Sequence, residues 1–437
     1  MNVARLPGRD RRGPAPPPDG PVQPATQEAE ARSKLHIETL ANDVGRVLLA
    51  PAPDVAALVE RLGLEQSLPP GDAQRLVYHI VVELNQAFFP PITKMELVLA
   101  EGCNLACSYC FEKSMRGKRK MSPGVARAAV DLLLDYSRDE SAVEITHVGG
   151  EPLLNFPTLA DATQYAASRA SATGKSIELS ITTNGTLLNE SIADYLVGHG
   201  VRVLLSIDGL APSHDRYRLD RQGRGTFDAV VAALVLLKER QQWIGVKMTV
   251  MPDNVPRLFD DVLGLYSLGA NQLVIGHATG MKWTGDEIAL YGREMQRLYH
   301  WYRQSPRDGL KISEFDDQPA TEAHFGCQAG RDSISVSPAG EISSCSKVLA
   351  LNNRQLIAKM GDVRYGVTHL GNRAQIVNCS RLRSACEELG IAGDYRGGCL
   401  ATNYEESGDL YQPSLADHAF SMLARSVQGA GVATLNP

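Results

Sequence analysis

The sequence predicts an α/β fold: a partial (β/α)6 barrel of the TIM type, with a helical N-terminal segment and a smaller C-terminal cysteine-rich domain. Six short apolar runs alternate with helical patterns between residues 93 and 305, as in parallel βαβ units. Polar loops, most of them rich in glycine, follow the first four of these runs. Beyond residue 305 the alternation stops, and five of the eight cysteines follow.

Composition and charge exclude several classes of protein. The chain of 437 residues is long enough for two or three domains, and 43% hydrophobic with 22% charged residues is typical of a soluble globular protein. The net charge of −6 gives no general attraction to nucleic acid. No apolar run reaches the roughly 18 residues of a membrane-spanning helix. We therefore expect neither nucleic acid nor a membrane among its partners.

Residues 1–32 are rich in proline, arginine and glycine and lack the apolar region of a secretory signal. We expect this segment to be a disordered arm and the protein to be cytoplasmic. In a reducing cytoplasm, clustered cysteines bind metal or take part in chemistry more often than they pair as disulfides.

Residues 33–92 are expected to be helical. Asp54 stands as an N-cap before the periodic run VAALVERL, and residues 69–88 form a second, longer helix. After the first apolar run, KMELVLA, Ser122 is placed as the N-cap of the next helix, with Pro123 at its first position.

The barrel is expected over residues 93–305 and the cysteine-rich domain over 306–437. Further strands are expected at VEITHVGG, IELSITT, VRVLLSI, GVKMTV and NQLVIGH. The loops CNLACSYC, GGEP, TTNG and SIDG fall at strand ends on the C-terminal face, where such barrels bind ligands. In the second domain we expect a β-hairpin that turns near Pro338–Gly340, followed by irregular structure.

Cys103, Cys107 and Cys110 lie close together after the first strand. Three local thiolates suit a four-iron cluster, in which they leave one iron open to a further ligand. A zinc site completed by a distant cysteine, or a chance cluster of buried thiols, is the alternative.

The Cys-x3-Cys-x2-Cys spacing, with Tyr109 before the last cysteine and Phe111 after it, resembles the radical S-adenosylmethionine (SAM) enzymes. This resemblance extends over residues 93–305. It implies that the three cysteines hold a [4Fe-4S] cluster whose fourth iron binds SAM. An electron from a donor such as flavodoxin or ferredoxin would then cleave SAM to methionine and a 5'-deoxyadenosyl radical, which takes hydrogen from the substrate.

The resemblance also implies which residues contact SAM. The GGEP loop would receive the amino group of the methionine part of SAM. The ends of the third and fourth strands would contact the ribose and methionine parts of SAM, and one arginine would bind the methionine carboxylate. Tyr109 would pack on the adenine or be a plain loop aromatic. The other implied contacts are Gly149, Gly150, Glu151, Asn184, Ser206, Asp208 and Arg218. We expect His147 to be a packed barrel histidine and Arg116–Lys120 to be a solvated turn.

A second set of cysteines begins with Cys327 and Cys345, with a glycine five residues before Cys345. This pattern resembles the start of the auxiliary-cluster region called SPASM, or its shortened form, twitch. Cys386 and Cys399 match the first and last cysteines of the motif that follows, and Leu389 and Tyr395 replace the middle two. One auxiliary [4Fe-4S] cluster is therefore implied, on Cys327, Cys345, Cys386 and Cys399, with Cys379 as a rival for the fourth position. A cluster with one open site, a zinc knuckle and buried free thiols are the alternatives.

Radical SAM enzymes with such domains mostly act on peptides. The resemblance therefore implies modification of a ribosomally synthesised precursor peptide by crosslinking, epimerisation or related C–H activation. The helices in 33–92 would contact a leader peptide or cap the barrel.

Three other functions stay open. A twitch-type dehydrogenase would oxidise a small alcohol or sugar. Sulfatase maturation, which forms formylglycine, is less favoured because Ser346 stands where those relatives have aspartate. A non-catalytic iron–sulfur protein would not cleave SAM. The sequence does not identify the catalytic acid or base; Asp332 and Asp394 are candidates, but either suits an ordinary turn.

Overall fold

The computed structural model describes residues 46–48, 50, 55, 57, 60, 71–112, 117–304, 309–316, 325–351, 359–393 and 395–429. The chain divides into two units, Met1–Val47 and Leu48–Pro437, and the fold described below is that of the second. The arm expected at 1–32, the helix capped by Asp54, and Asp394 lie outside the described residues.

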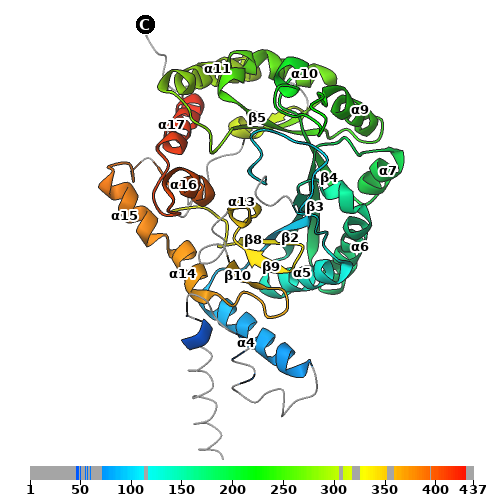
Figure 1. The fold of residues 1–437 in the computed structure, drawn as a ribbon, viewed down its shortest axis with the longest axis vertical. Helices are drawn as coiled ribbons and strands as arrows, with labels where there is room; N and C mark the ends of the chain where they lie inside the picture. Colours follow the sequence, from blue (N-terminus) through cyan, green and yellow to red (C-terminus); the bar gives the residue numbers. More distant parts are fainter. Residues whose placement is uncertain are drawn as a thin grey trace, which may run out of the picture. The chain divides into compact units, whose positions relative to one another are not determined.

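One sheet of ten strands runs through the described part of the second unit, in the order β10-β9-β8-β1-β2-β3-β4-β5-β6-β7 (Figure 1). The six predicted strands are confirmed, and each pairs in parallel with the next. They are β1 (Lys94–Ala100), β2 (Ala142–Gly149), β3 (Ser176–Thr183), β4 (Arg202–Ser206), β5 (Gly245–Val250) and β6 (Gln272–His277). A two-residue strand, β7 (Lys311–Ile312), pairs in parallel with β6.

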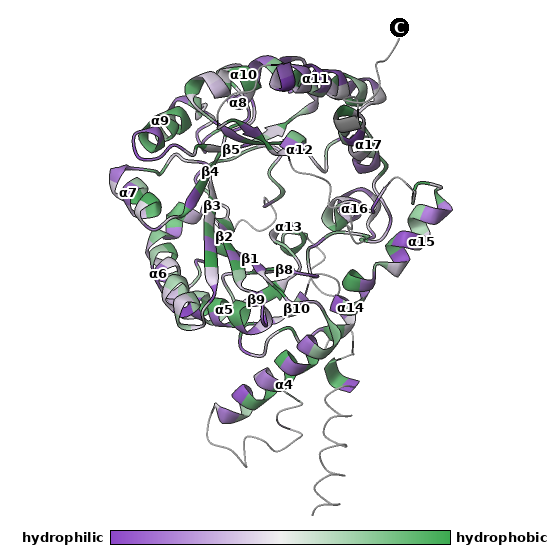
Figure 2. Ribbon diagram, turned by 180° about the vertical axis from the view of Figure 1, so that it is seen from behind, coloured by the Kyte–Doolittle hydropathy of each residue, from purple (hydrophilic) through white to green (hydrophobic). Residues whose placement is uncertain are grey.

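Helices follow the strands and form the outer layer of the barrel (Figure 1). They carry both hydrophobic and hydrophilic residues (Figure 2). The Ser122 side chain accepts a hydrogen bond from the backbone N–H of Val125, as its predicted N-cap role requires. The longer helices are α5 (Pro123–Tyr136), α6 (Phe156–Ala172), α7 (Glu190–Gly198), α9 (Phe227–Lys238), α10 (Leu258–Leu268) and α11 (Gly285–Gln304); the short ones are η2 (Pro152–Asn155), α8 (Ala211–His214) and η3 (Pro252–Arg257). The second helix predicted before the barrel is also present, as α4 (Asp72–Phe88).

The predicted hairpin around Pro338–Gly340 is present and belongs to the barrel sheet. Strand β8 (Ser333–Val336) pairs in parallel with β1, β9 (Glu341–Ser343) returns antiparallel to β8, and β10 (Lys359–Asp362) lies antiparallel to β9. The sheet therefore crosses the boundary expected near residue 306. The cysteine-rich region is joined to the barrel by backbone hydrogen bonds along β1.

The segment after the hairpin is mostly helical, so the expectation of irregular structure there is wrong. These helices are mostly short, and only Cys379 separates the helices over residues 370–378 and 380–388, so no long periodic pattern marks them in the sequence. They are α13 (Ser346–Leu349), α14 (Leu370–Asn378), α15 (Ser380–Glu388), α16 (Leu400–Ser407) and α17 (Leu415–Gly429), and α12 (Ser313–Asp316) precedes the hairpin. Among the described residues, no helix is both long enough and apolar enough to cross a membrane.

Strand residues alternate between the helix-covered outside of the barrel and its interior. Met95, Leu97 and Leu99 of β1 belong to the main hydrophobic core together with residues of α5. By the same alternation, Glu96 of β1 and Lys247 of β5 lie on the interior face. The main core therefore lies between sheet and helices, and the interior face of β1 carries Glu96 as well as Val98, which packs in a small apolar cluster with Leu349 and Ala350.

His147 is a buried histidine on the helix-covered face of β2. Its Nε2 lies 3.5 Å from the Thr163 hydroxyl of α6, and the side chain is 1% exposed. Burial lowers the pKa of His147 to about 4, so the ring is neutral in the folded protein. This environment agrees with the expected packing role and not with a ligand.

Acid should destabilise the fold through His147. The unfolded histidine, with a pKa of about 6.5, binds a proton before the folded one does, so stability is lost as the pH falls from about 6.5 to about 4. Between pH 7 and pH 5, wild type should lose about 2 kcal/mol more of its unfolding free energy than His147→Gln. Denaturant titrations at both pH values measure this difference. His300→Gln, at an exposed histidine, should behave like wild type, and equal losses in all three proteins would contradict the assignment.

Candidate active site

The GGEP loop packs directly against the start of the cysteine loop. The backbone N–H groups of Gly150 and Glu151 donate to the carbonyls of Ala100 and Gly102, both at 2.9 Å. A Cβ atom on Gly149 would lie 2.5 Å from the Ala100 oxygen, and one on Gly150 would lie 2.4 Å from the Gly102 oxygen. Glycine is therefore required at both positions for the two backbones to touch.

Cys103, Cys107 and Cys110 lie together at the end of β1. Burial, with smaller contributions from Glu151, Cys107 and Cys110, raises the pKa of the Cys103 thiol to about 11, although the hydrogen bond from Leu105 N–H lowers it. Backbone Leu105 N–H donates to Cys103 Sγ at 3.3 Å. Hydrogen bonds to thiolate sulfur and the surrounding burial are among the ways a protein sets the potential of an iron–sulfur cluster. A loop of three thiols with an N–H group aimed at one sulfur therefore suits such a cluster.

Among the described residues, which include all eight cysteines, no three His, Cys, Asp or Glu side chains are arranged to hold one metal ion. A zinc site needs its ligands within about 2.3 Å of a single point. In a four-iron cluster each thiolate binds a different iron, so the sulfur atoms lie further apart. The described thiols therefore offer no preformed site for a single zinc ion.

Glu151 links the second and third strand ends. Its carboxylate accepts hydrogen bonds from the Thr183 hydroxyl at 2.7 Å, from Asn184 N–H at 2.9 Å and from Leu153 N–H at 3.0 Å. Burial raises the pKa of Glu151, and these bonds oppose that rise. The Asn184 side chain in turn donates to Asn104 Oδ1 at 2.9 Å and lies 3.7 Å from Cys103 Sγ. The TTNG loop is thus held against the cysteine loop.

Tyr109, Asp208 and Arg218 form a buried network. Arg218 Nε donates to Asp208 Oδ2 at 2.8 Å, the Tyr109 hydroxyl donates to the same oxygen, and Thr249 N–H donates to Asp208 Oδ1 at 2.9 Å. The Arg218 guanidinium also lies 5.4 Å from the Tyr109 ring centre. Burial alone would lower the pKa of Arg218, but the attraction of the Asp208 carboxylate outweighs burial and holds the pKa of Arg218 above its usual value. Ser206, also a predicted SAM contact, ends β4 nearby and is buried.

Cys327, Cys345 and Cys399 form the second group of thiols. Burial raises the pKa of Cys327 to about 11, and Cys399 adds to this effect; the pKa of Cys345 is raised by burial, then by Glu96 and by the other two cysteines. Backbone N–H groups of Ala329 and Val348 donate to the sulfurs of Cys327 and Cys345 at 3.4 and 3.3 Å. The structure therefore brings together three of the four predicted auxiliary ligands.

Cys379 and Cys386 differ in their surroundings. Cys379 lies near enough to Cys327 to raise its pKa, and its own thiol donates to the Ile376 carbonyl at 2.7 Å. Cys386, on α15, packs in an apolar cluster with Leu382 and Tyr395. Cys379 is buried in the same apolar cluster, so the two thiols differ in that Cys379 lies near Cys327 and not in their packing. Asp332 also lies near Cys327, and its Oδ1 is buried with no hydrogen-bond partner among the described residues.

Charged side chains inside the barrel, among them Glu96, Glu112 and Lys247, lie between the two cysteine groups. The sequence analysis did not identify them as candidates. Burial raises the pKa of Glu112 to about 7; Glu96 and Glu151 raise it and Lys247 lowers it. Glu96 Oε2 accepts a hydrogen bond from Ser346 N–H at 2.7 Å, next to Cys345. In the sequence, these groups could have been found from the strand alternation, which places Glu96 in the run KMELVLA and Lys247 in the run GVKMTV on the inward face.

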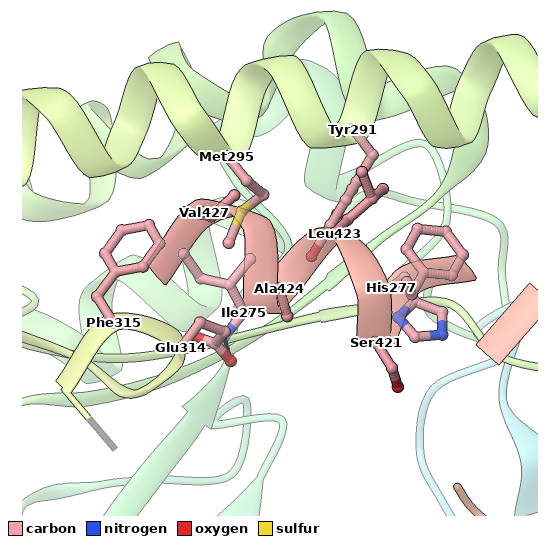
Figure 3. A pocket seen from close by; sticks show the side chains of 11 residues that line it. Ile275, His277, Tyr291, Met295, Glu314, Phe315, Ser421, Leu423, Ala424 and Val427 are labelled. Atoms are coloured by element: carbon pink, nitrogen blue, oxygen red, sulfur yellow. Dashed lines mark hydrogen bonds between the residues drawn. The ribbon is translucent and has the colours of Figure 1, made fainter. Parts of the chain in front are cut away.

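A cavity of about 200 Å³ lies between β6, α11, α12 and α17, and its walls are mainly apolar (Figure 3). At one end, His277 stacks on Phe420 with ring centres 3.8 Å apart. His277 Nε2 lies 3.7 Å from Asp417 Oδ1, and Asp417 Oδ2 accepts hydrogen bonds from Cys399 N–H at 3.1 Å and the Tyr395 hydroxyl at 2.9 Å. Helix α17 is thus attached both to the end of β6 and to a cysteine of the second group.

Comparison with known proteins shows a family match within the barrel. Residues 97–265 match the Radical SAM superfamily. The radical SAM cyclopropyl synthase TigE of Paramaledivibacter caminithermalis is 26% identical, over 76% of this chain and 73% of that protein. A serine-type anaerobic sulfatase-maturating enzyme of Klebsiella aerogenes is 29% identical, over 69% and 78%. An uncharacterised protein of Methanocaldococcus jannaschii is 30% identical, but the match spans only 40% of this chain and 59% of that protein.

Solved structures show the same fold. The structure of anSMEcpe with bound AdoMet (SAM) and the Cp18Cys peptide has a TM-score of 0.62 at 17% identity, covering 78% of this chain and 97% of that one. Streptococcus suis SuiB bound to its precursor peptide SuiA has a TM-score of 0.58 at 14% identity, covering 79% and 80%. At such identities the likeness shows the fold alone.

Gly150→Ala should weaken SAM binding at least about tenfold, equivalent to about 1.4 kcal/mol, because its Cβ would push the GGEP backbone away from Gly102. Anaerobic calorimetry with SAM and the reconstituted protein measures the change. Gly198→Ala is the matched control, since a Cβ there meets nothing within 4 Å. Unchanged SAM binding in Gly150→Ala would show that the two loops need not touch.

Removal of Cys327, Cys345 or Cys399 should lower the iron content from about eight to about four per chain, since each group is expected to hold four irons. Iron and sulfide analysis after anaerobic reconstitution measures this. Cys379→Ser and Cys386→Ser are compared in the same way, and the variant that loses iron identifies the fourth ligand. A wild type with about four irons, unchanged by Cys345→Ala, would rule out the second cluster.

Proposed function

We propose that this radical SAM enzyme, whose domain of that superfamily spans residues 97–265, modifies a ribosomally synthesised peptide. Its cofactors are SAM and [4Fe-4S] clusters. Together these supply, when bound, the one-electron cleavage of SAM that begins hydrogen abstraction. The thiol groups described above suit the clusters in number and in surroundings.

The observation that carries the proposal is the pairing of β8 with β1. It joins the cysteine-rich region to the barrel, so that Cys345 lies beside Glu96 on the interior face of β1. The substrate would then lie between the two cysteine groups. The relatives support a substrate of protein nature: one matures sulfatases, and two structural neighbours were solved with peptides bound.

Each group of residues has a separate task in this proposal. Cys103, Cys107 and Cys110 hold the SAM-binding cluster, and Cys327, Cys345, Cys399 and a fourth cysteine hold the auxiliary one. Arg218, fixed by Asp208 through Nε, directs its other N–H groups to the methionine carboxylate. Gly149 and Gly150 bring the GGEP backbone close to the amino group, with Asn184 and Ser206 at the neighbouring strand ends.

The interior charges suit a polar backbone better than an apolar ligand. Lys247 is exposed to the interior, and Glu112 and Glu96 lie near it. Strands β8 and β9 are paired on both sides, so a peptide that adds as a strand would use the outer edge of β10 at the end of the described sheet, where backbone hydrogen bonds tolerate varied side chains. The described sheet ends at β10 and β7, and helices α16 and α17 lie on the side between these end strands (Figure 1), so we place peptide entry beside β10.

Formylglycine formation on a sulfatase is the second candidate, because several relatives bear that name. Ser346, in place of the aspartate of those relatives, argues against it. In the structure Ser346 provides a backbone N–H to Glu96, a contact that does not depend on its side chain. A small-alcohol dehydrogenase remains as the third outcome of the test below.

A peptide encoded beside the gene should increase 5'-deoxyadenosine release and change in mass, for example by about two hydrogens for a crosslink. Anaerobic incubation with SAM and dithionite, followed by mass spectrometry, measures both. Cys107→Ala should abolish SAM cleavage, and Cys399→Ala should retain cleavage without modifying the peptide. A sulfatase-derived peptide and small alcohols are tested in parallel. Turnover of either of these, with no peptide from the gene's surroundings altered, would overturn the proposal.

A further inference from the structure

Asp417, in the first turn of α17, holds the backbone of a proposed cluster ligand. Its Oδ2 accepts hydrogen bonds from Cys399 N–H at 3.1 Å and from the Tyr395 hydroxyl at 2.9 Å. Its own backbone N–H donates to the Ser414 hydroxyl at 2.9 Å, and its side chain is 14% exposed. One carboxylate oxygen therefore binds two points of the loop that carries Cys399.

The loop between Tyr395 and Cys399 wraps closely around this carboxylate. Gly397 and Gly398 adopt positive φ angles of 88° and 58°. A Cβ atom on Gly398 would clash with both Asp417 Oδ2 and the Tyr395 hydroxyl oxygen. Glycine is therefore required for the loop to pass this close to the carboxylate.

The backbone of Cys399 is fixed on both sides of its Cα atom. Asp417 holds the N–H group, and the carbonyl accepts a hydrogen bond from Asn403 N–H at 2.9 Å in the first turn of α16. With both peptide groups held, the direction in which the side chain leaves the backbone is set before a cluster binds. Hydrogen bonds around a metal ligand both orient that ligand and tune the metal.

Tyr395 stands where the SPASM resemblance expects a cluster cysteine. Its side chain is 1% exposed and packs in the apolar cluster that contains Cys386. Burial, followed by the Asp417 carboxylate, raises the pKa of Tyr395 far above its usual value, so the hydroxyl keeps its proton and stays a donor to Asp417. From the position of a missing ligand, Tyr395 thus supports the carboxylate that holds a neighbouring one.

Two contacts tie the second cysteine group to the end of β6, which is not a neighbour of β1 in the sheet. His277, at one end of the cavity beside α17, has its Nε2 3.7 Å from Asp417 Oδ1 (Figure 3). Lys347, two residues after Cys345, donates from Nζ to Thr279 Oγ1 at 2.6 Å. The cysteine group is therefore held from the β6 end as well as from β1, and Asp417 is the part of this link that contacts a thiol-bearing residue directly.

We propose that Asp417, supported by Tyr395, is a positioning residue for the auxiliary cluster, which fixes Cys399 and lowers the reduction potential of the cluster. The proposal rests on the proposed function, which assigns a cluster to this cysteine group. A carboxylate beside a cluster opposes the negative charge that reduction adds, and nearby charge is one of the factors that set the potential. Asp417 acts through Cys399 and is not itself a ligand, because its Oδ2 is occupied by an N–H and an O–H donor.

The first test is a redox titration of the full-length, reconstituted Asp417→Asn variant, followed by electron paramagnetic resonance. Addition of SAM alters the signal of the cluster that binds it, which identifies the other signal as that of the auxiliary cluster. Asparagine keeps the shape of the side chain and loses the charge. The ratio of reduced to oxidised auxiliary cluster at a given potential should rise about tenfold, which is a potential about 59 mV higher for one electron. The SAM-binding cluster should titrate as in wild type.

The second test measures how fast a chelator removes iron from Tyr395→Phe, which keeps the charge of Asp417 and loses one hydrogen bond. Release from the auxiliary cluster should be about fivefold faster, as expected for the loss of one hydrogen bond. The matched control is another tyrosine–aspartate pair, Tyr165 and Asp131 on the outer helices, whose hydrogen bond is 2.8 Å long. Tyr165→Phe and Asp131→Asn should match wild type in iron release and in both potentials.

An unchanged auxiliary potential in Asp417→Asn would overturn the proposal, as would equal iron release from Tyr395→Phe and Tyr165→Phe, or a wild type without a second cluster. If Asp417→Asn does not fold, the iron release of Tyr395→Phe decides. A wild type whose variants behave as expected, but which alters no peptide, would count against the proposed function alone.

Discussion

Strand β1 and its two parallel neighbours bring the GGEP loop and the two cysteine groups to one edge of the sheet. On one side β1 pairs with β2, whose end carries the GGEP loop; on the other it pairs with β8, which is preceded by Cys327 and followed, after the hairpin, by Cys345. The cysteine loop continues from β1 itself. Because strands in register bring their ends to one edge, two distant cysteine groups become neighbours without a separate interface between domains. The same arrangement lets the Ser346 N–H reach Glu96 Oε2 at 2.7 Å.

The sequence was most informative where a motif is local. The Cys103–Cys110 loop, GGEP, TTNG and SIDG occupy the strand ends predicted for them, because alternating apolar runs and glycine-rich turns leave direct marks in a sequence. The parallel pairing of β8 with β1 could not be predicted. It joins segments more than two hundred residues apart, and β8 has only four residues in which to show a pattern.

The fourth auxiliary ligand shows another limit of sequence spacing. Cys386 is predicted because it matches a motif position, and its thiol is buried in the same apolar cluster as that of Cys379. Cys379 matches no position, but the turn between α14 and α15, in which it adopts a left-handed φ of 50°, brings it beside Cys327. Spacing along the chain measures separation in space only where the backbone between two residues is known.

The Asp208–Arg218 pair shows how the fold prepares a charged site before a ligand arrives. Asp208 is fully buried and the Arg218 side chain is 11% exposed, so both have lost most of their hydration. Removing two charges from water costs more than their attraction commonly returns, so such a pair is a poor device for stability alone. Here the Asp208 carboxylate accepts hydrogen bonds from Thr249 N–H, the Tyr109 hydroxyl and Arg218 Nε. These bonds fix the arginine in one orientation. A guanidinium held in this way meets an anionic ligand without further loss of side-chain entropy, so less of the binding free energy is lost to ordering the site.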